Sequence, residues 1–445
     1  MIYRPVLIKN GHIIVNAGKA IDGGFVYLKD GVVAAAGKVS RLLPRVANAH
    51  IIDAGGRVVL PGFVNPHMHL YSQFAKGLSV PKMSSFGEIL EKLWWRLDKA
   101  LNEEDVYYSA LSGLVDGIKS GVTTVFDHHA SYGFIRGSLQ TISGAFLEAG
   151  VRGCLCFEVS DRHGGKARDD AIRENAAFLE NTAGHIKRNP HYPLRGMVGL
   201  HASMTLSDHT LAESRREMDN YGVGAHIHVA EGKEDSRAVK RLYNEGILRE
   251  GTIAAHCVHV DDRDLDILKK SGAFAVHNPQ SNLNNAVGVA PFLLMHKKKI
   301  PVGIGTDGMS AGIFGAVKLA SVLHKVTMSL RGPAGAAAIS TGFAETKRST
   351  MGINSNISSS IFGLKIGVLE KGAAADVVIS DYIPQTPLTN ENIWGHILYG
   401  VMNLPVRTTI CGGRILMKDF EIKTVGEGKI IAEAKKCAKR LWNRI

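Results

Sequence analysis

Residues 61–70, PGFVNPHMHL, are an apolar run that ends in two histidines one residue apart. Alternate residues of a β-strand point to the same side, so His67 and His69 would face the same point. Seven further runs of this kind follow, separated by stretches of helical length: GVTTVFDHH, VRGCLCFEV, RGMVGLHAS, GAHIHVAE, TIAAHCVHV, GAFAVHNP and PVGIGTDG. Alternating strands and helices predict an α/β protein with a parallel sheet, and eight such units predict a closed (β/α)8 barrel of the TIM type.

The two ends of the chain differ from this pattern. Residues 1–62 contain short β-rich runs broken by Asn-Gly and Asp-Gly, which are hairpin signals. Residues 363–427 return to short strands, such as GVLEKGAAADVVISD. We therefore predict a barrel over residues 63–362, inserted into a small β-sandwich domain that both chain ends build. Residues 428–445 alternate apolar and basic side chains at helical spacing, which predicts a basic amphipathic helix packed on the body.

The composition is typical of a large folded protein. The 445 residues are 45% hydrophobic and 21% charged, enough to bury a large core. Because no apolar stretch has the length of a membrane span, and Arg4 and Lys9 interrupt the start of the chain, we expect a cytoplasmic protein with no membrane partner. The five cysteines are scattered without a CxxC spacing and indicate ordinary buried thiols.

The net charge of +12 raises the question of an anionic partner. Part of this charge comes from the last seventeen residues, where lysines follow the polar face of the predicted helix. We interpret it as a solvated basic surface and expect no nucleic-acid partner, with an anionic partner as the alternative.

Four strand ends carry residues that can bind a metal ion. The first ends in His67 and His69, later ones carry His228 and His256, and the last ends at Asp307. In a (β/α)8 barrel the active site lies at the C-terminal ends of the strands, so these side chains would converge. Imidazoles and a carboxylate that leave room for water suit zinc, iron or manganese.

The motifs PGFVNPHMHL, HVAE, AHCVH, HNPQSN and GTDG resemble, in order and spacing, those of the amidohydrolase superfamily. More narrowly, they are similar to its mononuclear branch, which contains triazine hydrolases, guanine deaminase and the S-adenosylhomocysteine and methylthioadenosine deaminases. The resemblance spans essentially the whole chain. Within that branch, the run FDHHAS at 126–131 is most similar to the aminohydrolases called SsnA.

This resemblance implies a particular set of site residues. The metal ligands that it implies are His67, His69, His228 and Asp307. Glu231 matches the proton-handling glutamate of the branch, and His256 matches the residue placed beside the metal. Binuclear members resemble one another in using a lysine on the fourth strand, and residues 196–203 contain none, which favours a single ion.

The function implied is a metal-dependent aminohydrolase with one divalent ion, zinc first, with iron or manganese as alternatives. Metal-bound hydroxide would attack an amino-bearing carbon of a nitrogen heterocycle, such as a purine or pterin, and ammonia would leave. Asp307 would take the proton of the water and return it to the leaving amine. Glu231 would protonate the ring nitrogen, and His256 would stabilise the charge that develops.

Two other functions stay open. The same site could displace chloride from a triazine or open a cyclic amide. From another class, the chain could be a non-catalytic scaffold or a nucleic-acid-binding member of the fold, although it retains every expected ligand together with Glu231. Because proteins that resemble this one are often dimers, we expect a homo-oligomer.

Substrate contacts are predicted at the rim of the barrel, at Gln73, His201, His277, Asn278 and His128. His128 and His129 could instead bind a second metal or pack in the rim. Trp94 and Trp95 could form part of a lid or pack against the barrel. Asn284 and Asn285 depart from the pattern of close nucleoside deaminases, which speaks against an adenosine-like substrate.

Overall fold

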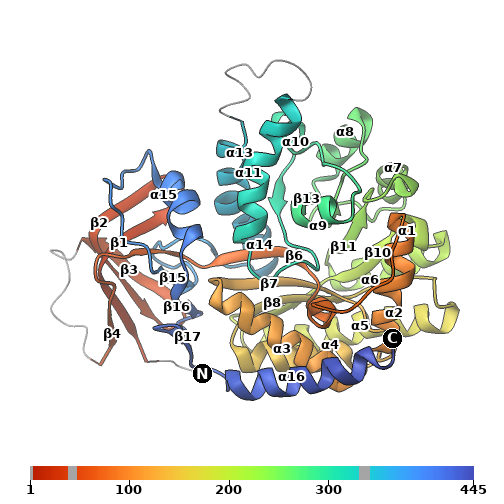
Figure 1. Ribbon diagram of the computed structural model, residues 1–445, viewed down its shortest axis with the longest axis horizontal. Helices are drawn as coiled ribbons and strands as arrows, with labels where there is room; N and C mark the ends of the chain where they lie inside the picture. Colours follow the sequence, from red (N-terminus) through yellow and green to blue (C-terminus); the bar gives the residue numbers. More distant parts are fainter. Residues whose placement is uncertain (1–3, 39–47, 330–340) are drawn as a thin grey trace.

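The computed structural model describes residues 4–38, 48–329 and 341–445. It consists of a β-rich domain, at the left of Figure 1, and an α/β barrel beside it. The strands of the barrel are β6 (Phe63–Met68), β7 (Val122–His129), β8 (Arg152–Phe157), β9 (Leu194–Gly196), β10 (Val198–Ala202), β11 (Ala225–Val229), β12 (Ile253–His256), β13 (Phe274–His277) and β14 (Val302–Ile304).

The barrel is parallel and closed, with β9 and β10 as two parts of its fourth strand. Neighbouring strands pair in sequence order within two sheets, β6 to β9 and β10 to β14. Two single bridges join these sheets: Val159 pairs with Leu200, and Met68 pairs with Asp307. The second bridge brings the end of the last strand beside the end of the first, which is where both carry predicted metal ligands.

Helices surround the barrel and connect its strands (Figure 1). The outer helices are α3 (Glu103–Lys119), α4 (Ser138–Ala149), α5 (Gly165–Arg188), α6 (Asp208–Tyr221), α7 (Ala238–Asn244), α8 (Asp262–Ser271), α9 (Pro279–Asn284), α10 (Phe292–Lys297), α11 (Phe314–Ser329), α13 (Phe343–Lys347) and α14 (Asn354–Phe362). Shorter turns complete the connections: η2 (Leu70–Ala75), α1 (Phe86–Ile89), η3 (Leu90–Trp94), α2 (Trp95–Ala100), η4 (Ser203–Thr205), η5 (Lys233–Asp235) and η6 (Arg348–Ile353).

The β-rich domain is one connected sheet built by both ends of the chain. Its strands are β1 (Val6–Asn16), β2 (Lys19–Lys29), β3 (Val32–Lys38), β4 (His50–Asp53), β5 (Val58–Pro61), β15 (Val377–Ser380), β16 (Val406–Cys411), β17 (Arg414–Lys418) and β18 (Glu421–Ile422). The strands β5 and β15 pair antiparallel and join the N-terminal part to the C-terminal part. The C-terminal part also holds α15 (Ile393–Tyr399) and η7 (Val401–Asn403), and α16 (Glu427–Trp442) follows it.

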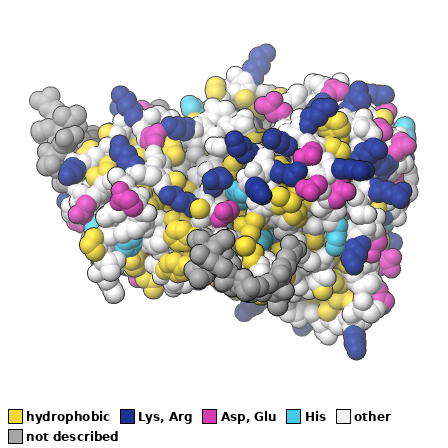
Figure 2. All heavy atoms as spheres, turned by 90° about the horizontal axis from the view of Figure 1, so that it is seen from above, with side chains coloured by type: hydrophobic (Ala, Val, Ile, Leu, Met, Phe, Trp, Pro, Cys, Tyr) yellow, Lys and Arg dark blue, Asp and Glu magenta, His cyan; other side chains and the backbone are white. Residues whose placement is uncertain are grey.

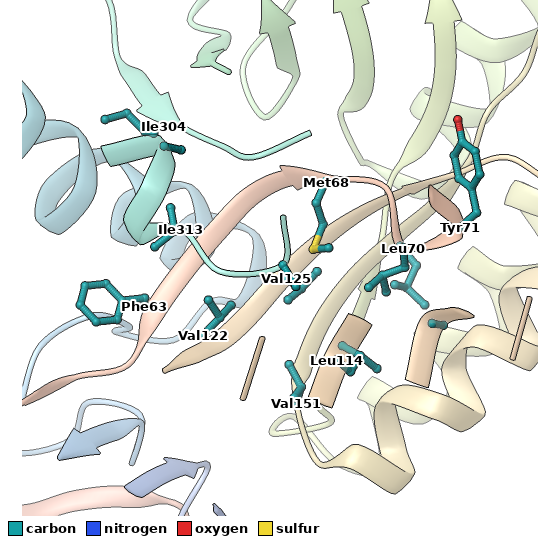
Figure 3. Close-up of a cluster of buried hydrophobic side chains, with 14 of the residues drawn as sticks. Phe63, Met68, Leu70, Tyr71, Leu114, Val122, Val125, Val151, Ile304 and Ile313 are labelled. Atoms are coloured by element: carbon teal, nitrogen blue, oxygen red, sulfur yellow. The ribbon is translucent and has the colours of Figure 1, made fainter. Parts of the chain in front are cut away.

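Two hydrophobic cores support these parts. Alternate side chains of β1 pack into different cores. Ile13 and Val15 belong to the core of the β-rich domain, and Ile14 belongs to the core of the barrel. Figure 3 shows part of the barrel core, where Phe63 and Met68 of β6 lie near Val122 and Val125 of β7. The predicted metal ligands at the end of β6 therefore stand on a strand that is buried along its length.

The predicted fold class, a TIM-like barrel with a β domain from both chain ends, is confirmed by this architecture. The domain boundaries at 62, 362 and 427 remain predictions. The five cysteines are buried and unpaired. Within the described ranges, no helix combines the length and the apolar character needed to cross a membrane. On the face shown in Figure 2, lysine and arginine side chains are interspersed with aspartate and glutamate.

Candidate active site

The four predicted metal ligands converge at the C-terminal ends of the strands. His67 and His69 come from the end of β6, His228 from β11, and Asp307 follows β14. One ligand atom from each lies within 4.8 Å of the others. The His69 Nε2 atom is 2.9 Å from Asp307 Oδ1 and 3.2 Å from His228 Nε2. The strands thus bring three imidazoles and a carboxylate to one point, as predicted from their spacing.

Backbone carbonyls orient two of these imidazoles. The Nδ1–H of His69 donates to the carbonyl of His128, and the Nδ1–H of His228 donates to the carbonyl of His201 over 2.8 Å. With the hydrogen on Nδ1, each ring presents the Nε2 lone pair to the centre of the group. The strand ends therefore fix the tautomer that a metal ligand needs.

His67 has a side chain as its partner. Its Nδ1 atom is 2.7 Å from Nε2 of His226, which lies two residues before His228 on β11. Its Nε2 atom is buried and has no hydrogen-bond partner among the described residues, but lies 3.7 Å from Asp307 Oδ1. Leaving a buried nitrogen unpaired costs about 1–3 kcal/mol. An ion bound between His67 and Asp307 would remove that cost, so the residues fit a divalent metal.

The proton-handling residues lie against the same carboxylate. His256 Nε2 is 3.6 Å from Glu231 Oε2 and 3.7 Å from Asp307 Oδ2, and His256 Nδ1 is 2.8 Å from Asn282 Oδ1. His256 and Asp307 both have positive φ, at 73° and 56°. Such backbone strain in non-glycine residues costs of order 1–3 kcal/mol and is typical of functional sites. It aims both side chains at Glu231.

The pKa values of the Glu231 and Asp307 carboxyl groups shift in opposite directions. Burial, together with the negative charge of Asp307, raises the pKa of Glu231 to about 8. Burial also opposes ionisation of Asp307, but its interactions with the neighbouring imidazoles of His67, His69 and His256 outweigh it and hold the pKa of Asp307 well below its usual range. At neutral pH, Glu231 therefore carries a proton and Asp307 carries a charge, the pairing expected of an acid and a base.

A cavity opens beside these groups and encloses about 540 Å³, including the part open to solvent. Its polar lining comes from the predicted site and its neighbours, and its apolar lining is mainly aromatic. The lining residues include His69, His201, His228, Glu231, Asp307, Asn285, Asp98, Glu158, Tyr71, Phe86, Trp94 and Trp95.

Part of the cavity wall is a buried ion cluster that the sequence did not indicate. The Arg162 guanidinium binds the carboxylates of both Asp98 and Glu158, and all three side chains are at most 6% exposed. Burial raises the pKa of Asp98 to about 8 despite the charge of Arg162. Neither Asp98 nor Glu158 belongs to a recognisable motif, because one lies in a helix after β6 and the other follows β8.

Four predicted substrate contacts lie outside the cavity lining, whereas His201 is part of it. Gln73 and Asn278 are buried, and His277 packs against Phe292 with ring centroids 5.2 Å apart. His128 is completely buried behind the wall. Their substrate roles remain predictions.

Trp94 and Trp95, for which a lid role and a packing role were both open, line the cavity. Asn285, which departs from the deaminase pattern, also lines it, and its side-chain amide favours the ionised form of Glu231 and so partly opposes the effect of burial on the pKa of Glu231. Phe86, Tyr71 and Asn282 were not predicted. The signal for Asn282 was its position in HNPQSN, beside residues that were predicted to contact substrate.

A model described as the amidohydrolase family matches residues 58–416. The chain belongs to this family. It is 29% identical to a 5'-deoxyadenosine deaminase of Methanosarcina mazei over 460 residues, covering 99% of each chain. It is 30% identical to a 5-methylthioadenosine/S-adenosylhomocysteine deaminase of Thermococcus sibiricus over 425 residues, covering 93% of this chain and 94% of that one.

Solved amidohydrolase structures share the fold. An adenosine deaminase of Xanthomonas campestris with bound zinc has a TM-score of 0.79 at 19% identity and covers 98% of each chain. A triazine hydrolase from Arthrobacter aurescens has a TM-score of 0.80 at 19% identity, covering 98% of this chain and all of the other. The predicted family and branch are confirmed. So is the predicted class of enzyme, a metal-dependent deaminase that hydrolyses a carbon–nitrogen bond of a cyclic amidine.

Proposed function

We propose that this amidohydrolase removes the exocyclic amino group of a 6-aminopurine nucleoside as ammonia, with zinc as its metal. The observation that carries the proposal is the arrangement of Glu231, His256 and Asp307, which places a protonated and an ionised carboxyl group beside the same nitrogen, Nε2 of His256. The named relatives act on adenosine-type nucleosides, and one solved neighbour contains zinc, which supports these choices.

His67, His69, His228 and Asp307 would hold the ion. When bound, a divalent ion lowers the pKa of a coordinated water and supplies a nucleophile at neutral pH. His69, His228 and Asp307 line the cavity, so a water molecule or a substrate atom would reach an ion held by these four residues from that side. Zinc suits this mixed nitrogen and oxygen donor set.

The remaining residues move protons. Asp307, kept ionised, would accept the proton released by the attacking water and pass it to the leaving amine. Glu231, kept protonated, would donate to the ring nitrogen next to the attacked carbon, and Asn285 holds its carboxyl group in place. His256 donates Nδ1–H to Asn282, so a proton gained at Nε2 would let it stabilise negative charge near both carboxyl groups.

The shape of the cavity fits a flat ring. Trp94, Trp95, Tyr71 and Phe86 supply aromatic surface, and their rings can stack on or contact a heterocycle from its edge. The departure at Asn284 and Asn285 argued against an adenosine-like substrate. Asn285 lines the same cavity as Glu231, so this departure falls beside the proposed proton donor.

Ammonia release over a substrate panel tests the proposal. The panel should hold 5'-deoxyadenosine, 5'-methylthioadenosine, S-adenosylhomocysteine, guanine, an aminopterin-type ring and a chlorotriazine. We expect ammonia from an adenosine-type nucleoside and an inosine-type product that mass spectrometry identifies. Turnover that releases chloride or opens a ring without ammonia would support the alternative hydrolase instead. The dimer and the cytoplasmic location remain predictions, the first of which light scattering can test.

A further inference from the structure

His128, at the end of β7, and Glu158, just after β8, face each other beside the metal ligands. Both are buried, with exposures of 0% and 3%. The His128 Nε2 atom lies 3.0 Å from the carbonyl of Leu200 and 3.1 Å from the carbonyl of His226. Because a carbonyl oxygen only accepts, Nε2 must carry the hydrogen. In the neutral ring the other nitrogen, Nδ1, then bears a lone pair.

That lone pair faces an anion. The Nδ1 atom is 3.7 Å from Glu158 Oε2, and it has no hydrogen-bond partner within residues 4–38, 48–329 and 341–445. Two acceptor atoms that face each other in a buried place repel one another and leave both unsatisfied. The geometry therefore requires a positive charge or a donor between them.

The charges around Glu158 point to a cation. Its Oε1 atom binds Arg162, and the same guanidinium also binds Asp98. One buried arginine thus faces two buried carboxylates, which leaves a negative charge without a partner if both are ionised. A proton on Asp98 would balance this charge but leave the acceptor atoms of His128 and Glu158 facing each other, whereas a proton on His128 Nδ1 or a bound cation would resolve both.

We propose that His128 Nδ1 and Glu158 Oε2 bind a second divalent cation beside the ion of the proposed function. Their separation of 3.7 Å equals that between Nε2 of His67 and Oδ1 of Asp307, two ligands of the first ion. Two ligand atoms that each lie about 2.1 Å from a tetrahedral zinc ion are about 3.4 Å apart, so a slightly wider angle at the ion would fit the observed separation.

The second ion is bound more weakly than the first. One ligand atom each of His128, Glu158 and His228 lies within 4.8 Å of the others, so the two ions are neighbours. The Nε2 atom of His228 has one lone pair and serves the first ion, which leaves the second with two protein ligands. Glu158 lines the cavity while His128 lies behind its wall, so water or a substrate atom would complete the coordination from the side of Glu158. His128, predicted to contact the substrate, would then act on the substrate through this ion.

Crystals of the full chain grown with Co²⁺ test the site directly. We expect two anomalous peaks at the cobalt absorption edge, one of them between His128 Nδ1 and Glu158 Oε2. A single peak at the first centre, with a water molecule or no density between His128 and Glu158, overturns the proposal. This measurement needs no variant, so it does not depend on how a substitution affects folding.

Metal counting in solution uses matched variants. At rising free Co²⁺ held by a chelator buffer, the wild-type chain should bind two ions in separate steps. His128→Gln keeps an amide donor near the position of Nε2 but lacks an atom at Nδ1, and Glu158→Gln removes the anionic ligand. Each should weaken the second step at least about 10-fold and leave the first step unchanged.

His129→Gln is the control, because His129 is the next residue of β7 and its Nε2 atom instead meets Ser131 Oγ at 2.8 Å. It should keep both binding steps, and equal loss of the second step in all three variants would contradict the assignment. Two ions without ammonia release from any substrate would leave the second site standing and remove the proposed function. Ammonia release from a chain that saturates at one ion would support the proposed function and rule out the second site.

Discussion

Glu231 illustrates how a single residue acquires its role from its surroundings. Burial and the neighbouring Asp307 raise the pKa of its carboxyl group to about 8, so the group is protonated below that pH. As the pH rises through 8 the proton donor is lost, and kcat should fall. Glu231→Gln should lower kcat by about 10²–10⁴-fold and remove this decline, because the amide does not titrate. A pH–rate profile of both proteins measures these effects.

The control at the residue scale is Glu234→Gln. Glu234 lies three residues further on and is exposed, so its substitution should leave kcat and the pH profile as they are. Metal content by mass spectrometry should be the same in all three proteins. If Glu231→Gln keeps the decline near pH 8, another group causes it and the role given to Glu231 is wrong.

The C-terminal helix α16 shows how an element outside the barrel supports the cavity wall. It packs on α3 and runs along the lower edge of the molecule in Figure 1. The spacing predicted a packed apolar face, and Ile430, Ala434, Cys437 and Leu441 are buried, whereas Ile431 is exposed. The Trp442 indole donates to the carbonyl of Phe74 over 2.7 Å, in the turn η2 that also carries the cavity residue Tyr71. The position of α16 on the surface of the molecule therefore accounts for its basic residues.

Leu441→Ala should lower the free energy of unfolding by about 2–5 kcal/mol, because this side chain is fully buried and leaves a cavity. Urea unfolding followed by circular dichroism measures the change. Lys439→Ala, on the exposed face of the same helix, should stay within about 0.5 kcal/mol of the wild type. Equal effects of the two substitutions would show that α16 is not held by its apolar face.

At the scale of the whole molecule, the barrel and the β-rich domain are joined by a buried ion pair. Arg152 begins β8 of the barrel, and Asp376 precedes β15 of the other domain. Their side chains are 7% and 1% exposed. Asp376 also accepts the backbone N–H of Gly412 over 2.8 Å, so the pair is fixed from both sides. The two domains should therefore unfold together.

Arg152→Met should lower the free energy of unfolding by about 3–5 kcal/mol, because it leaves the Asp376 carboxylate buried without its partner. The paired change Arg152→Met with Asp376→Asn removes the charge and keeps an acceptor for Gly412, so it should recover much of the loss. Thermal unfolding monitored by calorimetry distinguishes these outcomes. A separate transition for each domain in the wild type would contradict the expected cooperation.

Much of the site was predictable because it depends on local rules. A strand repeats every two residues, so His67 and His69 had to share a face, and parallel strands place their C-terminal ends together. The same reasoning held for His228, His256 and Asp307, each at or near the end of its strand. The composition and the hairpin signals likewise predicted a β domain from both chain ends.

The sequence by itself determined the fold class, the family and the candidate ligands of the proposed first metal, since these follow from periodicity and from motifs at strand ends. Only the tertiary structure decided that Asp98, Glu158 and Arg162 form one buried cluster, and that His128 faces Glu158. It also placed Gln73 and His277 behind the cavity wall. The physical reason is that these relations join residues on different strands and connecting segments, whose side-chain directions are set by packing and not by any local repeat.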